Sequence, residues 1–299
     1  MSELAKNKIP RVCAVHDLSG FGRVSLTEVL PCLAAMGVEA CPLPTAILST
    51  HTYKFTGYSF LDLTQEMKNI IEHWERLDVD FDAIYTGYLG SGSQIEILIE
   101  YIEKLKKKKT IVIVDPVLGD NVLSDCRNLY SDRMNDVLLG MKNMVAKADI
   151  ITPNLTEATL LLDEEYEHYV SDEKLKTYLI KLSDMGPEKV AITSVMTDKN
   201  EMSVAVYDRA DNKFYKIDCA YIKKMFHGTG DIFASIMTGA IVKGESFLNA
   251  CLRASGFVKC AIEETLKHTE LETENGVCFE QILIKYFADI KSVPFFKEI

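Results

Sequence analysis

The sequence predicts a doubly wound α/β fold, in which helices flank both faces of a mostly parallel central sheet. Three observations predict it. Short, nearly all-apolar runs alternate with longer segments of helical periodicity, as strands buried on both faces of a sheet require. Polar clusters follow these runs, where a parallel sheet carries its ligand sites. Beyond residue 203, two alternating runs flank a turn rich in Asp and Asn, which predicts a small antiparallel hairpin at one sheet edge.

The first half of the chain opens with an apolar run at 11–16, which predicts a buried strand, and an amphipathic helical pattern at 24–36. Strands and helices are then predicted in alternation. They are a strand at 38–43, a helix at 60–77, a strand at 82–86, a helix at 91–107, a strand at 110–114 and a helix at 129–147.

The second half continues the pattern and adds the hairpin. Its predicted elements are a strand at 149–152, a helical segment from 154, a helix at 172–184, a strand at 189–193, hairpin strands at 203–207 and 213–217, and helices at 230–243, 247–267 and 279–288. No linker rich in Pro, Gly or Ser and no internal repeat interrupts the chain. We therefore expect residues 1–299 to form a single domain.

The composition excludes several classes of function. The 299 residues are 47% hydrophobic and 26% charged, and the formal net charge is -11. This acidity disfavours nucleic acid and anionic membranes as partners. No apolar leader follows Met1, and no run approaches the roughly 20 apolar residues that span a bilayer. We expect a cytoplasmic protein in which any phosphate is bound locally, by backbone amides, a metal ion or a few lysines.

The eight cysteines are scattered, and no Cys-x-x-Cys pair occurs among them. Several lie inside apolar runs, where a free cysteine behaves as a small buried hydrophobe. Their spacing predicts reduced structural thiols and no metal site.

Polar clusters stand where the predicted strands end. Ligands of an open parallel sheet bind beyond the carboxyl ends of its strands. One such cluster is an ordinary loop, but several on one rim predict a binding site. The clusters are Asp17-Leu18-Ser19-Gly20-Phe21-Gly22, Pro44-Thr45, Gly87-Tyr88-Leu89-Gly90, Asp115-Pro116-Val117-Leu118-Gly119-Asp120, Pro153-Asn154-Leu155-Thr156-Glu157 and Ser194.

The segment Gly228-Thr229-Gly230-Asp231 opens a helix whose body is almost wholly apolar. Two glycines before a buried helix expose backbone amides at the positive end of the helix dipole, where an anion binds. Asp231 has two interpretations there. It is a first-turn carboxylate that favours the dipole, or it is a general base that takes a proton from a substrate hydroxyl while the amides stabilise a phosphoryl group.

Three further residues also have two interpretations. Asp115 ends an apolar strand, where it caps the next turn or meets a cation. Asn154 and Glu157 are three residues apart at the start of a helix, so they form a capping box or face one ligand together. Asp115 and Glu157 together are suited to hold Mg²⁺ through water, because Mg²⁺ binds few carboxylates and keeps several waters.

A dinucleotide fingerprint is suggested by Gly20-Phe21-Gly22-Arg23-Val24-Ser25 and rejected on its context. Ser25 replaces the third glycine, and Glu39 lies at the start of the second strand, on the wrong rim. Among the histidines, His51 lies near the proposed rim, whereas we expect His16 and His227 to be packed and hydrogen-bonded.

These residues resemble the ribokinase-like superfamily, and within it the pyridoxal kinases, from about residue 12 to about residue 267. The resemblance rests on Gly228-Thr229-Gly230-Asp231, on Asn154-Leu155-Thr156-Glu157, on Pro44 to Thr52 and on Thr86 to Ser91. It implies a ribokinase-like fold that transfers the ATP γ-phosphoryl group to the 5'-hydroxymethyl group of a vitamin B6 vitamer. It also implies Mg²⁺, K⁺ in some relatives, and a homodimer.

The resemblance also implies a role for each site residue. Gly228, Thr229, Gly230 and Asp231 are the implied catalytic group. The implied substrate contacts are Asp17, Ser19, Gly20, Thr45, Ser49, His51, Tyr88 and Asp231. The implied nucleotide contacts are Asp115, Asp120, Thr152, Asn154, Glu157, Thr193, Ser194, Lys223, Gly228 and Gly230, with Asp115 and Glu157 also as metal ligands.

Two alternatives remain open. Asp17-x-Ser19-Gly20 and His227 are similar to hydroxymethylpyrimidine kinases, which phosphorylate another small ring bearing a hydroxymethyl group, although those enzymes commonly carry Cys where this chain has Asp231. The other alternative is a non-catalytic ligand-binding protein, which is disfavoured because Asp231 and both glycines are present.

Overall fold

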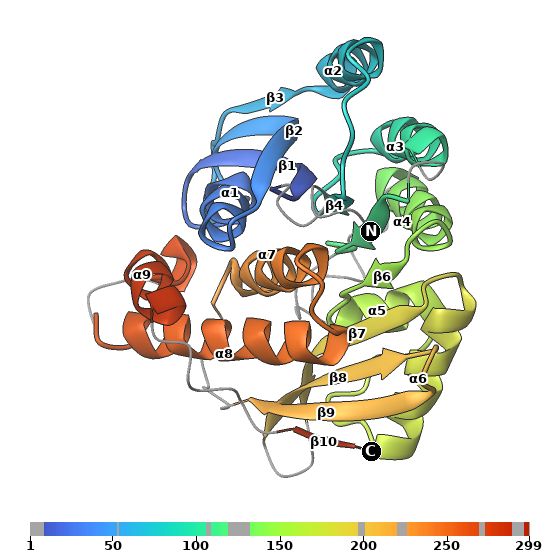
Figure 1. Ribbon diagram of the computed structural model, residues 1–299, viewed down its shortest axis with the longest axis vertical. Coiled ribbons are helices and arrows are strands. Elements are labelled where there is room, and N and C mark those ends of the chain that lie inside the picture. The colour runs from blue at the N-terminus through green and yellow to red at the C-terminus, as the bar shows by residue number, and fades with distance from the viewer. Residues whose placement is uncertain are drawn as a thin grey trace.

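The computed structural model is built around one ten-stranded sheet with the strand order β10-β9-β8-β7-β6-β5-β4-β1-β2-β3 (Figure 1). The structure describes residues 9–52, 54–105, 109–118, 132–196, 201–219, 226–268, 273–288 and 296–298. Neighbouring strands run parallel from β2 through β1, β4, β5 and β6 to β7, and antiparallel at both ends of the sheet. The predicted α/β fold with a mostly parallel sheet is confirmed.

The strands alternate with helices along most of the chain. The strands are β1 Arg11–Phe21, β2 Glu39–Thr50, β3 Phe60–Asp62, β4 Ala83–Thr86, β5 Ile111–Val114, β6 Ile150–Ile151, β7 Lys189–Met196, β8 Met202–Asp208, β9 Lys213–Cys219 and β10 Phe296–Glu298. The helices are α1 Leu26–Ala35, α2 Thr64–Arg76, α3 Gly92–Leu105, α4 Asp132–Val145, α5 Leu155–Leu162, α6 Asp172–Asp184, α7 Thr229–Val242, α8 Phe247–Thr265 and α9 Glu280–Ala288.

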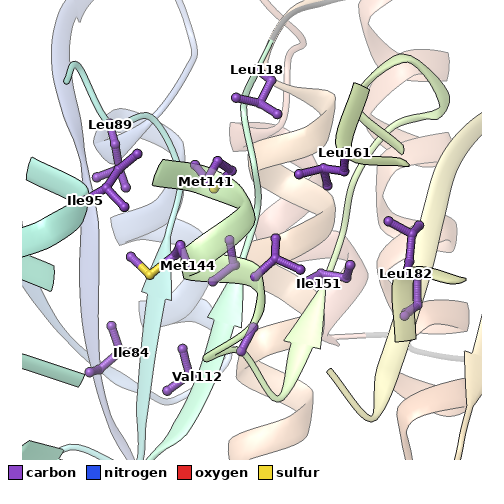
Figure 2. Packing of buried hydrophobic residues seen from close by; sticks show 14 of the residues in the cluster. Ile84, Leu89, Ile95, Val112, Leu118, Met141, Met144, Ile151, Leu161 and Leu182 are labelled. Carbon is purple, nitrogen blue, oxygen red and sulfur yellow. The ribbon is translucent and has the colours of Figure 1, made fainter. Parts of the chain in front are cut away.

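The helices form two layers, one on each face of the sheet (Figure 1). One apolar cluster joins α1, α7, α8 and α9 to the first face, and a second cluster joins α2 to α6 to the other. Figure 2 shows the second cluster, in which Val112 and Ile151 of the central strands lie against Met141, Met144 and Leu161 of the helices. Burial on both faces explains why the central strands are nearly all apolar.

The structure corrects several predicted boundaries. Strands β1 and β2 run on to Phe21 and Thr50, past the polar residues that were expected to end them. Residues 60–62 were predicted as the start of a helix, but they form the edge strand β3, antiparallel to β2. The predicted hairpin is β8 and β9, although β10 pairs with the outer side of β9. These differences come from strand pairing between distant segments, which local periodicity does not report.

Backbone hydrogen bonds align the residues that follow neighbouring strands. Gly87 N donates to Val15 O (2.9 Å), Asp115 N to Thr86 O (2.9 Å) and Thr152 N to Val114 O (3.1 Å). The chain therefore leaves β1, β4, β5 and β6 on one rim, the rim on which an open parallel sheet binds ligands. No helix of the described residues is long and apolar enough to cross a membrane.

Candidate active site

A cavity of about 620 Å³ opens on this rim, a size typical of small-molecule sites. Its walls come from the ends of the parallel strands, the first turn of α7 and the start of α5. Most of the residues singled out from the sequence line it. They are Asp17, Ser19, His51, Tyr88, Asp115, Thr152, Asn154, Glu157, Thr193, Ser194, Gly228, Thr229, Gly230 and Asp231.

The first turn of α7 has the geometry of an anion cradle. Gly228 is the N-cap residue in the left-handed conformation (φ 81°), which residues with a side chain adopt only under strain. An added Cβ at Gly230 would have Asp115 Oδ2 as its nearest atom, 3.9 Å away, so the space above that residue is open. Because the first N–H groups of a helix have no intrahelical partner, this turn is suited to a phosphate.

Asp231 lies in the first turn of α7 and is fixed by contacts from β1, from β4 and from Ser25, the N-cap residue of α1. Its Oδ2 accepts a hydrogen bond from Ser25 N (2.8 Å), and its Oδ1 lies 3.7 Å from His16 Nδ1. The Tyr85 hydroxyl donates to its backbone carbonyl (3.4 Å). One carboxylate beside an anion cradle is the arrangement that base-assisted phosphoryl transfer needs.

His16 is fully buried beneath Asp231. Its ring lies edge-on to Tyr85 with centroids 4.4 Å apart, and a Cβ at Gly87 would come within 2.2 Å of its Nδ1. The expected packing is confirmed, but neither ring nitrogen has a hydrogen-bond partner within the described residues. Burial lowers the pKa of His16 to about 3, so the imidazole beside Asp231 is neutral and does not neutralise the base.

This burial makes His16 a source of acid instability. Its folded-state pKa of about 3 lies below the ordinary value of 6.5, so the unfolded chain binds the proton first as the pH falls. The stability is complete above pH 6.5 and decreases towards pH 3, with a loss of about 2 kcal/mol at pH 5. We expect His16→Phe to flatten the decrease in melting temperature between pH 7 and pH 5. The matched control is His73→Gln on the exposed surface of α2; equal slopes for wild type and His16→Phe would contradict the assignment.

Asp17 is held inside the cavity by two hydroxyl groups. Ser19 Oγ donates to its Oδ2 (2.8 Å), and Ser25 Oγ donates to its Oδ1 (2.5 Å). Burial raises the pKa of Asp17, while both hydroxyls and nearby His51 act in the opposite direction. The side chain is thus a rigid polar group at the wall of the cavity.

Elsewhere in the cavity lining, Glu157 and Asn154 form the capping box of α5. Glu157 Oε2 accepts from Asn154 N (2.8 Å), and Asn154 Oδ1 accepts from Glu157 N (2.9 Å). Leu118 N donates to Glu157 Oε1 (3.1 Å). The capping interpretation of this pair is confirmed, and the pair also lines the cavity.

A bulge in β7 turns two further polar residues towards the cavity. The pairing of β7 with β8 shifts register between Ile192 and Val195, and Ser194 has a positive φ of 56°. Thr193 N donates to Pro153 O (2.9 Å), which attaches the bulge to the loop before α5. A bulge re-aims side chains at the end of a strand, and Thr193 and Ser194 both line the cavity.

The carboxylate oxygens that line the cavity are suited to bind a Mg²⁺ ion through water. No group of three or more His, Cys, Asp or Glu residues suited to a metal occurs in the described part of the chain. Asp115 and Glu157 nevertheless line one cavity, and each oxygen of Glu157 that accepts an N–H retains further acceptor capacity. Mg²⁺ needs only one or two carboxylates when substrate phosphates and water complete its shell.

Three predicted site residues that the structure describes, Thr45, Ser49 and Gly20, do not line the cavity. Thr45 is buried and donates to Tyr88 O (3.1 Å), so its side chain holds the Tyr88 loop. Ser49 is exposed on the other side of β2, where its Oγ accepts from Ser59 N (2.9 Å). Gly20 faces the backbone of β2. Asp120 and Lys223 lie outside the described residues.

The sequence patterns did not identify Ser25 or the stacking role of His227 as parts of the site. Ser25 contacts both Asp17 and Asp231, and its signal was the spacing Ser25-x-x-Glu28, a capping-box pattern. His227, which was assigned only packing and hydrogen bonding, stacks on His51 with ring centroids 5.4 Å apart and lines the cavity. No sequence pattern indicated that stacking.

The rejected dinucleotide fingerprint has a structural explanation. Gly22 has a positive φ of 89°, and an added Cβ would come within 2.5 Å of the His51 ring. Glu39 begins β2 at the far rim, where Arg11 Nε donates to it (2.9 Å). Gly22 therefore leaves room for the His51 ring. Glu39 lies at the other end of β2, away from the cavity.

The fold and the site together define an ATP-dependent small-molecule kinase of the ribokinase-like superfamily. The model of the phosphomethylpyrimidine kinase family matches residues 30–276. The chain belongs to this family.

Two solved structures that resemble this chain are described as different kinases. A Bacteroides thetaiotaomicron protein described as a phosphomethylpyrimidine kinase, in a crystal form with pyridoxal, is 43% identical over 98% of this chain and 100% of its own, with a TM-score of 0.90. Pyridoxal kinase from Lactobacillus plantarum is 28% identical over 94% and 98%, with a TM-score of 0.83.

A bifunctional thiamine biosynthetic enzyme of Arabidopsis thaliana is 27% identical over 86% of this chain and 47% of that protein. The chain therefore spans about half the length of the bifunctional relative.

Proposed function

We propose that this protein transfers the γ-phosphoryl group of ATP to the 5'-hydroxymethyl group of a vitamin B6 vitamer: pyridoxal, pyridoxamine or pyridoxine. The observation that carries the proposal is Asp231, held by Ser25 N beside the open amide turn at Gly230. Because the base and the anion cradle share one helix turn, an acceptor hydroxyl and a phosphoryl group bound there would be adjacent. The similarity to a structure with pyridoxal supports the ring.

The proposed reaction is carried out by position and charge. Asp231 accepts the proton of the hydroxymethyl group as its oxygen attacks the γ-phosphorus, and the bond to the ADP oxygen breaks. The amides at 228–230 stabilise the charge on the transferred group. Because His16 is neutral, no adjacent cation opposes proton uptake by Asp231 from that side.

The nucleotide is proposed to occupy the wall formed by β5, β6, β7 and α5. Residues that line this wall are Asp115, Thr152, Asn154, Glu157, Thr193 and Ser194. Asp115 and Glu157 would hold Mg²⁺ through water, and Mg²⁺ supplies positive charge that the acidic chain lacks. Asp120, Lys223 and a K⁺ requirement remain part of the proposal by family resemblance.

Hydroxymethylpyrimidine is the second candidate substrate. Asp17 and Ser19 form a fixed polar pair in the cavity, and His227 precedes the cradle; both features are similar to hydroxymethylpyrimidine kinases. The family match and the thiamine biosynthetic relative support this candidate. Asp231 favours the vitamer, because cysteine is common at that position in those kinases.

A coupled ATP-consumption assay separates the two substrates. We expect pyridoxal, pyridoxamine or pyridoxine to give kcat/KM at least about tenfold above hydroxymethylpyrimidine, which corresponds to about 1.4 kcal/mol of transition-state binding. The assay contains Mg²⁺, with and without K⁺, and a reaction lacking acceptor measures background hydrolysis. A preference for hydroxymethylpyrimidine would reverse the substrate assignment, and no stimulation by any of the four would refute the proposed function.

We also propose that residues 1–299 form one cytoplasmic kinase domain and that this domain forms a homodimer. Family resemblance supports the dimer. Large exposed side chains near the β3 edge also support it, namely Ile47, Phe60 and Leu61, because contiguous apolar surface is typical of an interface.

A further inference from the structure

Helix α1 begins with a capping-box sequence that is not closed. Ser25-Leu26-Thr27-Glu28 has the Ser-x-x-Glu spacing in which the Ser side chain accepts from the third residue and the Glu side chain accepts from the Ser N–H. Helix α5 of the same chain closes its box in this way through Asn154 and Glu157. At α1, Ser25 makes no side-chain cap hydrogen bond. The two helices thus provide an internal comparison.

The N–H and the hydroxyl of Ser25 instead form hydrogen bonds with two carboxylates of the active site. Its N–H donates to Asp231 Oδ2 (2.8 Å) and its hydroxyl donates to Asp17 Oδ1 (2.5 Å). Ser25 adopts φ 52° and ψ -137°, whereas the cap residue Asn154 is extended at φ -74° and ψ 172°. A non-glycine residue persists in such a conformation when its surroundings hold it there. Hydrogen bonds to the two carboxylates help to hold Ser25 in this conformation.

The Glu28 side chain, which would complete the box, is buried without a hydrogen bond. It is 0% exposed, and neither oxygen has a partner within the described residues. It packs behind the anion cradle, since a Cβ added at Gly228 would lie 2.3 Å from its Oε2. Helix α1 packs against α7 and α9 at this point (Figure 1). Glu28 therefore contacts the turn that carries Asp231.

Burial and the charges around Glu28 favour the neutral form of its carboxyl group. Burial raises its pKa well above the ordinary value, and the carboxylates of Asp231 on α7 and Glu280 on α9 act in the same direction. Arg23, in the loop before α1, lowers it, but Arg23 Nε is paired with Glu280 (2.5 Å). The Cys32 thiol on α1 is also near, and burial raises its pKa too. A neutral acid competes weakly for an N–H donor, whereas a carboxylate competes strongly.

We propose that Ser25 and Glu28 are positioning residues for Asp231: the capping box of α1 is held open so that the Ser25 N–H orients the base, and Glu28 competes for that N–H. The inference rests on the proposed role of Asp231. On ionisation, Glu28 takes the Ser25 N–H, Ser25 relaxes to an extended conformation, and Asp231 loses its donor. The rate is then expected to fall on the alkaline side.

The test compares the pH dependence of kcat in the full-length wild type, Glu28→Gln and Glu28→Met. Neither replacement ionises, Gln keeps the shape, and Met keeps the length without a strong acceptor. We expect the ratio of kcat at pH 9 to kcat at pH 7 to be about three to tenfold higher in both variants, as the loss of one charge-assisted hydrogen bond in wild type implies. All three proteins use the same substrates, so substrate ionisation cancels. Superimposable profiles would overturn the role of Glu28.

A second pair of variants tests Ser25 without a change of charge. Ser25→Gly and Ser25→Ala both lose the hydroxyl bond to Asp17, but glycine tolerates φ 52° and alanine does not. We expect Ser25→Ala to have a kcat about threefold to tenfold below that of Ser25→Gly, with similar KM for ATP. Equal kcat values would overturn the role of Ser25. A different result tests the proposed function itself: it would be contradicted if Asp231→Asn kept its activity, whatever the Ser25 and Glu28 variants show.

Discussion

Replacement of Asp231 by asparagine is expected to lower kcat by about 10²- to 10⁴-fold, the usual contribution of a general base. Asparagine has the same shape, and its side-chain oxygen still accepts from Ser25 N, which contacts Asp231 Oδ2 at 2.8 Å. It cannot accept the proton of the substrate hydroxyl. The melting temperature and the affinity for ATP should change little. Steady-state kinetics and calorimetric titration with ATP measure these quantities.

The matched control for this variant is Asp17→Asn in the same cavity. Asp17 is also a buried carboxylate, held by Ser19 and Ser25 hydroxyls, but in the proposed mechanism it binds the acceptor and takes no proton. We expect its replacement to raise KM for the acceptor more than it lowers kcat. If the Asp17 variant lost more kcat than the Asp231 variant, the assignment of Asp231 as the base would be wrong.

Gly228→Ala is expected to cause the second large effect, by disrupting the anion cradle. The residue has φ 81°, and an added Cβ would lie 2.3 Å from Arg23 O and 2.3 Å from Glu28 Oε2. The left-handed conformation and the overlap together should cost about 3 kcal/mol. We expect the melting temperature to fall by several degrees and kcat to fall with it, because the displaced turn also carries Asp231.

Gly230→Ala distinguishes a loss of phosphate binding in the cradle from a loss of packing behind it. The nearest atom to an added Cβ there is 3.9 Å away, Asp115 Oδ2, and Gly230 lies inside α7 at a position that tolerates alanine. We expect a normal melting temperature but weaker ATP binding, since the methyl group enters the space of the phosphate. Destabilisation equal to that of Gly228→Ala would contradict this account of the turn.

Local patterns predicted much of the fold and of the site. Apolar runs between helical patterns predicted the central strands, because burial on both faces leaves a signal in every residue. The cradle was predicted from two glycines before the apolar helix α7, and the cap of α5 from Asn154 and Glu157. Each of these features depends on neighbours in the sequence, so one sequence is enough to predict it.

Features that depend on distant segments were not predicted. Thr45 and Ser49 were expected in the cavity, but the pairing of β2 with β1 and β3 continues the strand past both residues. Leu48 then lines the cavity while Ser49 faces away, as alternation along a strand requires. The open cap at Ser25 likewise depends on Asp231, 206 residues away in the sequence.

Identification of the phosphorylated product tests the central claim most directly. Wild-type protein is incubated with pyridoxal, ATP and Mg²⁺, and the product is analysed by mass spectrometry and phosphorus NMR. We predict a phosphate ester at the 5'-hydroxymethyl oxygen, one ADP for each ester formed, and at least about a hundredfold less ester with Asp231→Asn in the same time. ATP consumption without an ester, or equal ester formation by Asp231→Asn, would contradict the assignment of Asp231 as the base of a vitamin B6 kinase.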